Sequence, residues 1–129
     1  MDKKDRHVLI VEDDDLMRDE LSHAFSEHGY AVSTAKSGEE AIVLALEREP
    51  DLIILDIMLP RMSGLETLKK LRSDPEGERT PVLILSNLSN DTALAEAIEI
   101  GGTDYLLKAD WTLDDVLKKV EQKFEEGVA

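Results

Sequence analysis

The sequence has no cysteine, no long hydrophobic run and few basic residues, and each absence narrows the possible classes of protein. Without cysteine the chain forms no disulfide bond, although this says little about compartment, because many proteins in oxidising spaces also lack cysteine. No apolar stretch approaches the roughly 20 residues that cross a membrane, and we expect no signal peptide. We therefore expect a cytoplasmic protein without a membrane partner.

Acidic residues outnumber lysine and arginine by 29 to 15, which gives a formal net charge of -14. Binding to nucleic acid or to anionic lipid relies on clustered lysine and arginine, so we expect no direct contact with nucleic acid. The chain has 129 residues, 42% of them hydrophobic, which suits one domain with one substantial core. We predict a single domain over residues 1–129, with its core over about residues 7–125.

Short apolar runs alternate with amphipathic segments, which indicates strands and helices in turn and hence a parallel sheet. The apolar runs predict strands at residues 8–11, 31–34, 52–55, 82–85 and 105–107. All but the second lack polar alternation, as expected for strands that helices cover on both faces. The predicted fold class is therefore α/β, a three-layer fold with five helices around a doubly wound, five-stranded parallel sheet.

The helical segments carry apolar stripes that are expected to face the core. Gly29 is expected to end the first helix, Ser37 to open the second and Pro50 to close it. Gly101 and Gly102 are expected to close the fourth helix, and residues 73–80 to form a loop. The stripes are Met17, Leu21, Ala24 and Phe25; Ala41, Leu44 and Ala45; Leu65, Leu68 and Leu71; Leu94, Ala97 and Ile98; and Leu113, Val116, Leu117, Val120 and Phe124.

Carboxylates stand where two of the predicted strands end. Asp56 follows the apolar run at residues 52–55, and Glu12 and Asp13 follow the run at residues 8–11. Two like charges about 4 Å apart repel by roughly 4 kcal/mol at an effective dielectric of about 20, so such a cluster stays protonated or holds a divalent cation. Oxygen ligands with open positions suit Mg²⁺ and leave room for a phosphate. The pattern predicts phosphoryl chemistry on a carboxylate.

Ordinary structural explanations also exist for these acidic residues. Asp13 and Asp14 fit the start of the first helix, where acidic residues favour the helix dipole. Asp56 fits a helix N-cap less well, because Pro60 and Gly64 come before the next helical pattern. The helix-start explanation therefore stays open for the first pair but does not account for Asp56.

A hydroxyl and a lysine also come directly after predicted strands, at Ser86 and Lys108. Alone, Ser86 is more often a turn residue and Lys108 a solvated side chain. Ligands of open parallel sheets, however, bind outside the carboxyl ends of the strands. The order acidic pair, aspartate, hydroxyl and lysine therefore predicts one shared site.

Four motifs in this order resemble the receiver domain of bacterial two-component response regulators. Any one of them is a weak signal, but four in order at strand ends form a strong joint signal over about residues 7–125. The resemblance implies a flavodoxin-like sheet with the strand order 2-1-3-4-5. The motifs are VLIVEDD at residues 8–14, LDIMLP at residues 55–60 followed by Gly64, PVLILS at residues 81–86 and GTDYLLK at residues 102–108.

The resemblance implies that Asp56 is a phosphoacceptor that takes a phosphoryl group from the phosphohistidine of a sensor histidine kinase or phosphotransfer protein. The chain would thereby catalyse its own phosphorylation and the slow hydrolysis of the acyl phosphate. The cofactor that the resemblance implies is Mg²⁺. Its ligands would be Glu12, Asp13, Asp56 and the backbone carbonyl of Met58.

The resemblance also implies a switch in a protein-binding surface. Lys108 would pair with the carboxylate at rest and with a phosphoryl oxygen after transfer, as an ammonium on a long stem can. Ser86 would donate its hydroxyl to another phosphoryl oxygen, and Tyr105 would rotate into the vacated space. The partner would be a downstream target protein, and the chain would act as a monomer or a phosphorylation-dependent homodimer.

Two positions depart from the family pattern. Ala109 follows Lys108 where the family usually has proline, so the cis bond that orients the lysine is not expected, because cis bonds are rare without proline. Asn87 stands where the family usually has a small residue. We expect this larger amide to hinder access of water and to slow dephosphorylation.

Other classes of protein fit the sequence less well. The alternative function is a receiver-like interaction module that is not phosphorylated, and the complete set of acidic, hydroxyl and lysine residues counts against it. A flavodoxin-like nucleotide binder needs a glycine- or hydroxyl-rich loop after the first strand, where this chain is acidic. An aspartyl phosphatase usually carries a second aspartate two residues after the nucleophile, at the position of Met58.

Overall fold

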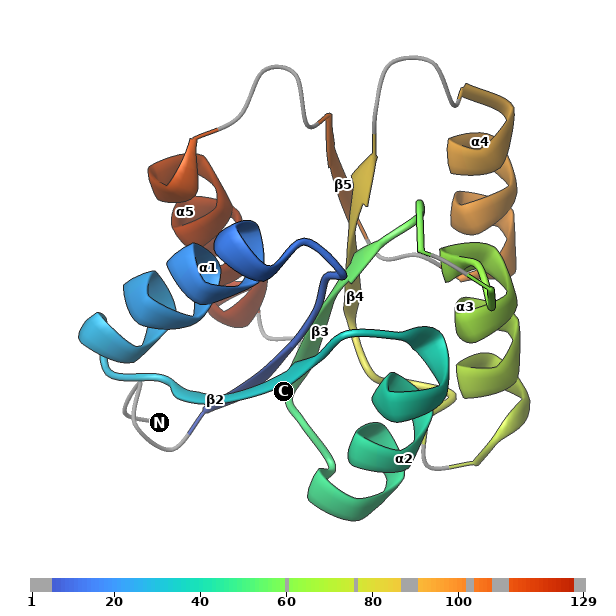
Figure 1. Cartoon of the computed structure of the whole chain (residues 1–129), viewed down its shortest axis with the longest axis horizontal. Helices are drawn as coiled ribbons and strands as arrows, with labels where there is room; N and C mark the ends of the chain where they lie inside the picture. Colours follow the sequence, from blue (N-terminus) through green and yellow to red (C-terminus); the bar gives the residue numbers. More distant parts are fainter. Residues whose placement is uncertain are drawn as a thin grey trace.

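A parallel five-stranded sheet lies between two layers of helices in the computed structural model (Figure 1). The structure describes residues 6–59, 61–75, 77–86, 91–101, 104–107 and 112–126. The strand order is β2-β1-β3-β4-β5, and every neighbouring pair is parallel. The predicted α/β fold class and the strand order implied by the resemblance are both confirmed. None of the described helices has the length and apolar character needed to cross a membrane.

Each of the five predicted strands is present and is one residue longer than the apolar run that predicted it. The two central strands beside the site, β1 and β3, are almost wholly buried, whereas the edge strand β2 is mostly half-buried. This difference matches the sequence, in which only the second run alternates with polar residues. The strands are β1 (His7–Val11), β2 (Ala31–Ala35), β3 (Leu52–Asp56), β4 (Val82–Ser86) and β5 (Asp104–Leu107).

Side-chain caps begin the four helices whose preceding residues the structure describes. Asp14, Ser37, Ser63 and Thr112 each accept a hydrogen bond from a backbone amide of the following turn, which satisfies a donor that the helix itself leaves free. Ser37 therefore opens the second helix as predicted. The helices are α1 (Asp15–Glu27), α2 (Gly38–Arg48), α3 (Gly64–Ser73), α4 (Asp91–Ile100) and α5 (Leu113–Glu125).

Left-handed backbone conformations follow three of the helices. Gly29 has φ 92° after α1, and Gly101 has φ 131° after α4, which are conformations that glycine adopts readily. Glu49, with φ 45°, ends α2 directly before Pro50. The three predicted ends are thus confirmed, with Gly102 outside the described residues. One boundary was wrong, because α3 continues through Ser73, where a loop was expected to begin.

Two hydrophobic clusters fill the spaces on either side of the sheet. The cluster under α2, α3 and α4 contains Leu55, Leu68 and Ala97, and the cluster under α1 and α5 contains Phe25 and Val116, among others. The predicted stripes face these clusters, except that Ile98 was wrongly expected in the core and is 44% exposed. Successive residues of a helix lie about 100° apart, so α4 buries Ala97 and turns its neighbour outward. The side chain of Leu94 is outside the described part of the structure.

Arg72 ties α3 to the C-terminal end of α4. Its guanidinium donates to the carbonyl oxygen of Gly101 from Nε at 3.1 Å and from Nη2 at 2.6 Å. Nη1 donates to the carbonyls of Gly77 and Thr80 at 2.7 and 2.8 Å. Burial lowers the pKa of this group. These four hydrogen bonds to three carbonyls join α3 to the segment before β4 and to the end of α4. They lie at the amino-terminal ends of the strands, opposite the ends that carry the acidic motifs.

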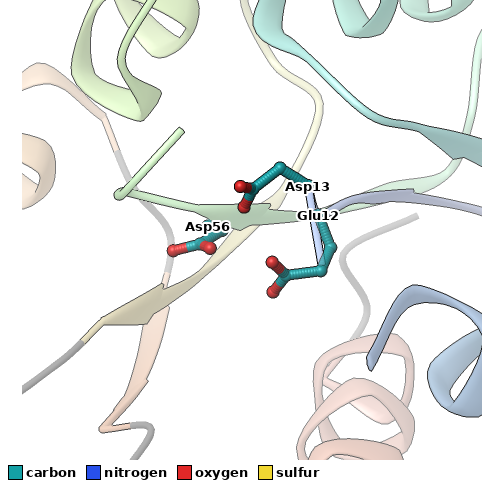
Figure 2. A group of neighbouring side chains, drawn as sticks. All are labelled: Glu12, Asp13 and Asp56. Atoms are coloured by element: carbon teal, nitrogen blue, oxygen red, sulfur yellow. The ribbon is translucent and has the colours of Figure 1, made fainter. Parts of the chain in front are cut away.

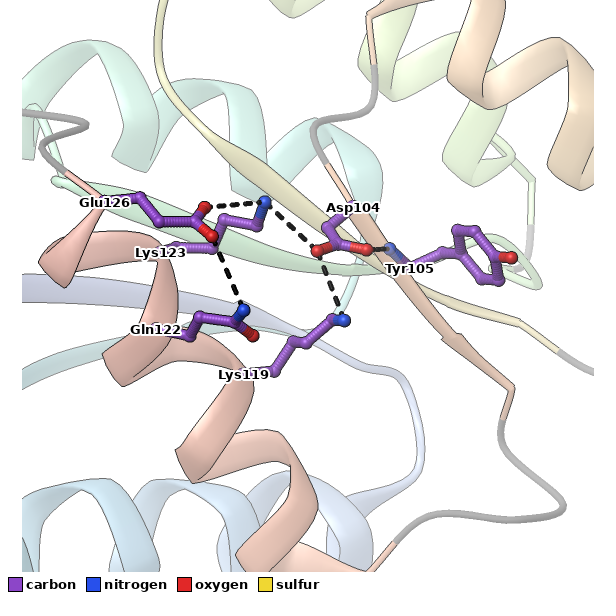
Figure 3. Close-up of polar contacts among 6 residues, drawn as sticks. All are labelled: Asp104, Tyr105, Lys119, Gln122, Lys123 and Glu126. Atoms are coloured by element: carbon purple, nitrogen blue, oxygen red, sulfur yellow. Dashed lines mark hydrogen bonds and ion pairs between the residues drawn. The ribbon is translucent and has the colours of Figure 1, made fainter.

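An ionic network connects β5 to α5 (Figure 3). Oδ2 of Asp104 lies 3.3 Å from Nζ of Lys119 and 3.1 Å from Nζ of Lys123, and Oδ1 accepts a hydrogen bond of 2.8 Å from the amide of Tyr105. Lys123 also lies 3.4 Å from a carboxylate oxygen of Glu126. This network fixes the start of the edge strand against the last helix.

Candidate functional site

The strand register brings two acidic segments of the chain together. β1 and β3 pair in parallel with Val11 opposite Leu55, so the residues that follow, Glu12 and Asp56, lie side by side at the carboxyl edge of the sheet. Asp13 joins them from the turn after β1, and the three side chains converge (Figure 2). One oxygen from each carboxylate lies within 4.8 Å of the others. The predicted convergence of these three residues is therefore observed.

The three carboxylates differ in their access to solvent. Glu12 and Asp56 are each 1% exposed, whereas Asp13 is exposed. Buried carboxylates at this spacing repel one another and favour either a bound cation or a bound proton. The donor set consists of oxygens only, which suits a hard divalent cation such as Mg²⁺ and does not suit the softer metals that prefer nitrogen or sulfur. The cluster fits the metal predicted from the sequence.

Local backbone contacts hold the Asp56 side chain at the end of β3. Its Oδ1 accepts a hydrogen bond of 3.0 Å from the amide of Met58. Two further hydrogen bonds hold the same loop: the amide of Ile57 donates to the carbonyl of Leu85, and the amide of Gly64 donates to the carbonyl of Ile57. Asp56 is not a helix N-cap, because Ser63 caps α3. The carboxylate is therefore placed for contact with other groups of the site.

Gly64 permits α3 to begin directly against the loop that follows β3. A Cβ atom at this position would lie 2.4 Å from the carbonyl oxygen of Asp56 and 2.5 Å from Cα of Ile57. Both contacts are with backbone, so no side-chain rotation would relieve them. The glycine of the second motif thus has a steric role: it lets α3 support the loop that carries Asp56 and Met58.

Glu12 is fixed at three places. Its amide donates to the carbonyl of Ala35 at 3.0 Å, which extends the pairing of β1 with β2. Its Oε2 accepts from the amide of Asp14 at 3.2 Å, and its carbonyl accepts from Nη1 of Arg18 at 3.1 Å. The backbone and the side chain of Glu12 are therefore both held in place.

The two aspartates that follow Glu12 have different roles. Asp14 caps α1 by accepting a hydrogen bond of 3.0 Å from the amide of Met17. Asp13 instead takes part in the carboxylate cluster. The helix-start explanation is correct for Asp14 and leaves Asp13 available to the site.

Other residues predicted for the site lie partly outside the described residues. Ser86 ends β4, one residue beyond Leu85, which pairs with Asp56, so its backbone lies at the same edge of the sheet. The Ser86 side chain and Lys108 are outside the description, as are Asn87 and Ala109. Tyr105 lies on the edge strand β5 with 42% of its surface exposed. Their predicted roles stay predictions.

Sequence reasoning missed Arg18, whose side chain extends from α1 and contacts the backbone carbonyl of Glu12. It is 9% exposed, and its Nη2 pairs with Oδ1 of Asp15 at 2.5 Å. The hydrogen bond and charge of Arg18 hold the pKa of Asp15 below its usual value. The sequence did contain a sign of this contact: Arg18 directly follows Met17, a residue of the predicted apolar stripe, and comes three residues after the acidic run at residues 12–15.

Comparisons with known proteins show the family of this chain. The family model described as the response regulator receiver domain matches residues 8–121. The transcriptional regulatory protein AfsQ1 of Streptomyces coelicolor is 36% identical over 101 residues, which cover 78% of this chain and 44% of that protein. The response regulator MprA of Mycobacterium sp. (strain KMS) is 34% identical over 113 residues, covering 88% and 48%. The chain spans about half the length of these curated relatives.

Solved structures extend the similarity to nearly the whole chain. The chemotaxis response regulator CheY4 of Vibrio cholerae superposes with a TM-score of 0.84 at 32% identity, covering 91% of this chain and 97% of that chain. The receiver domain of NtrX from Brucella abortus superposes with a TM-score of 0.82 at 28% identity, covering 92% and 98%. Both neighbours share the arrangement of strands and helices described above.

Proposed function

Since the chain belongs to the response regulator receiver domain family of two-component systems, we propose that it accepts a phosphoryl group on Asp56. A carboxylate oxygen attacks the phosphorus of a donor phosphohistidine, the P–N bond breaks, and its electron pair stays on the imidazole nitrogen. The product is an acyl phosphate. An ionised carboxylate needs no general base for this step, only an in-line donor and neutralisation of charge.

One observation carries the proposal: Asp56 is buried at the carboxyl end of a central strand, with Glu12 and Asp13 converging on it. A purely structural aspartate at this place would be expected to cap α3, and Ser63 does so instead. A buried carboxylate among other carboxylates is costly unless the site is used with a cation. The arrangement supports a role for Asp56 as a nucleophile that acts with a divalent cation.

The oxygens of the cluster would hold Mg²⁺. Glu12, Asp13 and Asp56 offer carboxylate oxygens, and Met58 offers its backbone carbonyl from the loop that Asp56 itself orders. An ion held there would supply neutralisation of the charge on the phosphoryl oxygens. The chain's own contribution is to hold the nucleophile and its acidic neighbours in a fixed arrangement, in which Glu12 and Asp56 are shielded from water.

The same proposal assigns the residues that respond to the phosphoryl group. Lys108 pairs with the carboxylate and then with a phosphoryl oxygen, and Ser86 donates its hydroxyl to another. Tyr105 changes its packing in response, and its half-exposed position on the edge strand supports this role, because an edge side chain can move without disturbing the core. The binding surface that changes is formed by α4, β5 and α5.

The partners follow from this chemistry. In this proposal the chain acts in the cytoplasm and its donor is a sensor histidine kinase or a phosphotransfer protein. The output is binding to a downstream protein as a monomer or phosphorylation-dependent homodimer. The net charge of -14 supports a protein partner over direct contact with nucleic acid. Residues 1–129 act as one domain in this proposal.

Intact mass after incubation with acetyl phosphate or phosphoramidate and Mg²⁺ tests the proposal. We expect a gain of about 80 Da, the mass of one phosphoryl group, that requires Mg²⁺. The gain should be absent in Asp56→Asn and present in Asp19→Asn, which removes a carboxylate from the exposed face of α1. No gain with either small donor or with phosphohistidine would overturn the proposal and favour an interaction module that is not phosphorylated.

A further inference from the structure

Arg18, on α1, forms a hydrogen bond with the backbone of Glu12, a residue of the acidic cluster. Its side chain rises from the first turns of α1 and is 9% exposed. Nη1 donates to the backbone carbonyl of Glu12 at 3.1 Å, and Nη2 donates to Oδ1 of Asp15 at 2.5 Å. The guanidinium therefore joins the turn that carries Glu12 and Asp13 to the helix that follows.

Helix stability alone does not explain an arginine at this place. The N-terminal end of a helix carries a partial positive charge, so a cation near it is unfavourable unless it is compensated. Burying a guanidinium adds a desolvation cost, which a paired carboxylate and a hydrogen-bonded carbonyl offset. Asp14 already supplies the helix cap. The contact with Glu12 is therefore the feature that distinguishes Arg18 from an ordinary surface arginine.

The acidic cluster requires a group that fixes the positions of Glu12 and Asp13. Without a cation, repulsion among its carboxylates opposes the close approach of Glu12 and Asp13 to Asp56. Arg18 donates a hydrogen bond to the backbone carbonyl of Glu12, and Asp15 compensates the positive charge of Arg18. The Arg18–Asp15 pair therefore restrains the turn after β1 and adds little net charge. Arginine suits this role because its planar fork binds two acceptors at once and does not lose its proton.

We propose that Arg18, balanced by Asp15, is a positioning residue that preorganises Glu12 and Asp13 for a divalent cation. The inference rests on the proposed function insofar as the cluster binds Mg²⁺. Groups that orient metal ligands from behind often change metal affinity by about 10- to 100-fold when they are removed. Arg18 acts through a ligand's backbone, so we expect an effect near the lower end of that range.

A charge-neutral double variant tests the inference. Arg18→Met with Asp15→Asn removes one positive and one negative charge, keeps similar side-chain lengths and deletes the donor to the Glu12 carbonyl. The matched control is Lys118→Met with Asp114→Asn, which deletes an exposed ion pair of 3.2 Å near the start of α5. Both double variants leave the net charge unchanged. A third variant, Arg18→Lys, keeps the charge but can engage only one of the two acceptors well.

Calorimetric titration with Mg²⁺ measures the predicted effect directly. We expect the dissociation constant to rise about tenfold in the Arg18/Asp15 variant, to change less than about twofold in the control, and to fall between these for Arg18→Lys. The Mg²⁺ concentration for half-maximal phosphorylation should rise by the same factor. Phosphorylation at saturating Mg²⁺ should still reach the wild-type extent, which separates loss of metal affinity from damage to the nucleophile.

Two results would overturn the inference. One is a Mg²⁺ dissociation constant in the double variant within about twofold of wild type, including the case where only the thermal midpoint in chelator falls, which marks a purely structural role. The other is a wild-type protein that binds no Mg²⁺. A wild-type protein that binds Mg²⁺ and loses affinity in the variant, yet gains no phosphoryl group, supports the role of Arg18 and contradicts the proposed function.

Discussion

The amide of Met58 donates a hydrogen bond of 3.0 Å to Oδ1 of Asp56, so the backbone two residues onward orients the carboxylate. An asparagine at position 56 has the same acceptor atom in the same place. The turn can therefore form whether the side chain is charged or neutral. This separates the effect of the charge from the effect of the shape of the site, and it makes Asp56→Asn an informative variant.

We expect Asp56→Asn to be at least as stable as the wild type when metal is chelated. The substitution keeps the hydrogen bond from Met58 and removes one of the clustered negative charges. A gain of about 1 kcal/mol in unfolding free energy corresponds to a rise of roughly 3–5 °C in the thermal midpoint. Asp19→Asn, on an exposed surface, serves as the control. A lower midpoint for Asp56→Asn in chelator would contradict the repulsion argument.

Mg²⁺ should raise the thermal midpoint of the wild type, because the assembled cluster exists only in the native state. At a concentration ten times its dissociation constant, a ligand specific for the native state adds about 1.4 kcal/mol. Asp13→Asn and Asp56→Asn should reduce the shift, because each removes a carboxylate of the cluster. Scanning calorimetry with and without millimolar Mg²⁺ checks this. An unchanged wild-type midpoint would count against the metal site.

Gly64→Ala should destabilise the fold by about 1–3 kcal/mol, in the range of overpacking substitutions. The new Cβ would meet the backbone of Asp56 and Ile57 at 2.4 and 2.5 Å, so α3 or the loop must move. Urea unfolding measures the loss. Lys69→Ala, on the exposed face of the same helix, should change stability by less than about 0.5 kcal/mol. Equal effects of the two substitutions would show that the close approach at Gly64 is not a constraint.

Asp104 and Lys123 should contribute stability over a defined pH window. Burial opposes ionisation of Asp104, but the Tyr105 amide and the ammonium groups of Lys123 and Lys119 outweigh it, so its pKa lies below the usual value. Burial likewise opposes the charge on Lys123, but the hydrogen bond and charge of Asp104, with a smaller contribution from Glu126, raise its pKa.

The signs of these shifts set the limits of the window. The contribution of Asp104 is present above about pH 4 and is lost as pH falls through its lowered pKa. That of Lys123 is present below about pH 10 and is lost as pH rises through its raised pKa. Asp104→Asn should cost about 1 kcal/mol or less at pH 7 and nothing once the wild-type carboxyl is protonated. Urea unfolding at several pH values tests this, with Asp114→Asn as the control, and a constant difference at all pH values would refute it.

Much of the fold could be predicted because buried parallel strands leave uninterrupted apolar runs. The runs before Glu12 and Asp56 identified two strands and placed their carboxylates at strand ends. That these two strands are neighbours came from the resemblance, because periodicity says which segments are strands and not which strands pair. The three-residue cluster followed once both were known.

Contacts that depend on side-chain direction could not be predicted in the same way. Asp13 and Asp14 are equivalent in the sequence, and only the turn geometry sends one to the cluster and the other to the helix cap. Ile98 fits an apolar stripe, but its neighbour Ala97 takes the buried position. Arg18 and Arg72 bind backbone carbonyls, which every residue possesses, so the sequence contains no partner type by which to recognise these contacts.

The pairing of β1 with β3 also determines when the cluster can form during folding. The two strands are far apart along the chain: His7 and Asp51, which bond at their opposite ends, are separated by 44 positions. Contacts of this range carry a high entropic cost of loop closure and tend to form late, after more local structure. A cation that binds only the completed cluster has nothing to bind early in folding. It would therefore lengthen the lifetime of the native state by slowing unfolding, and leave the rate of folding nearly unchanged.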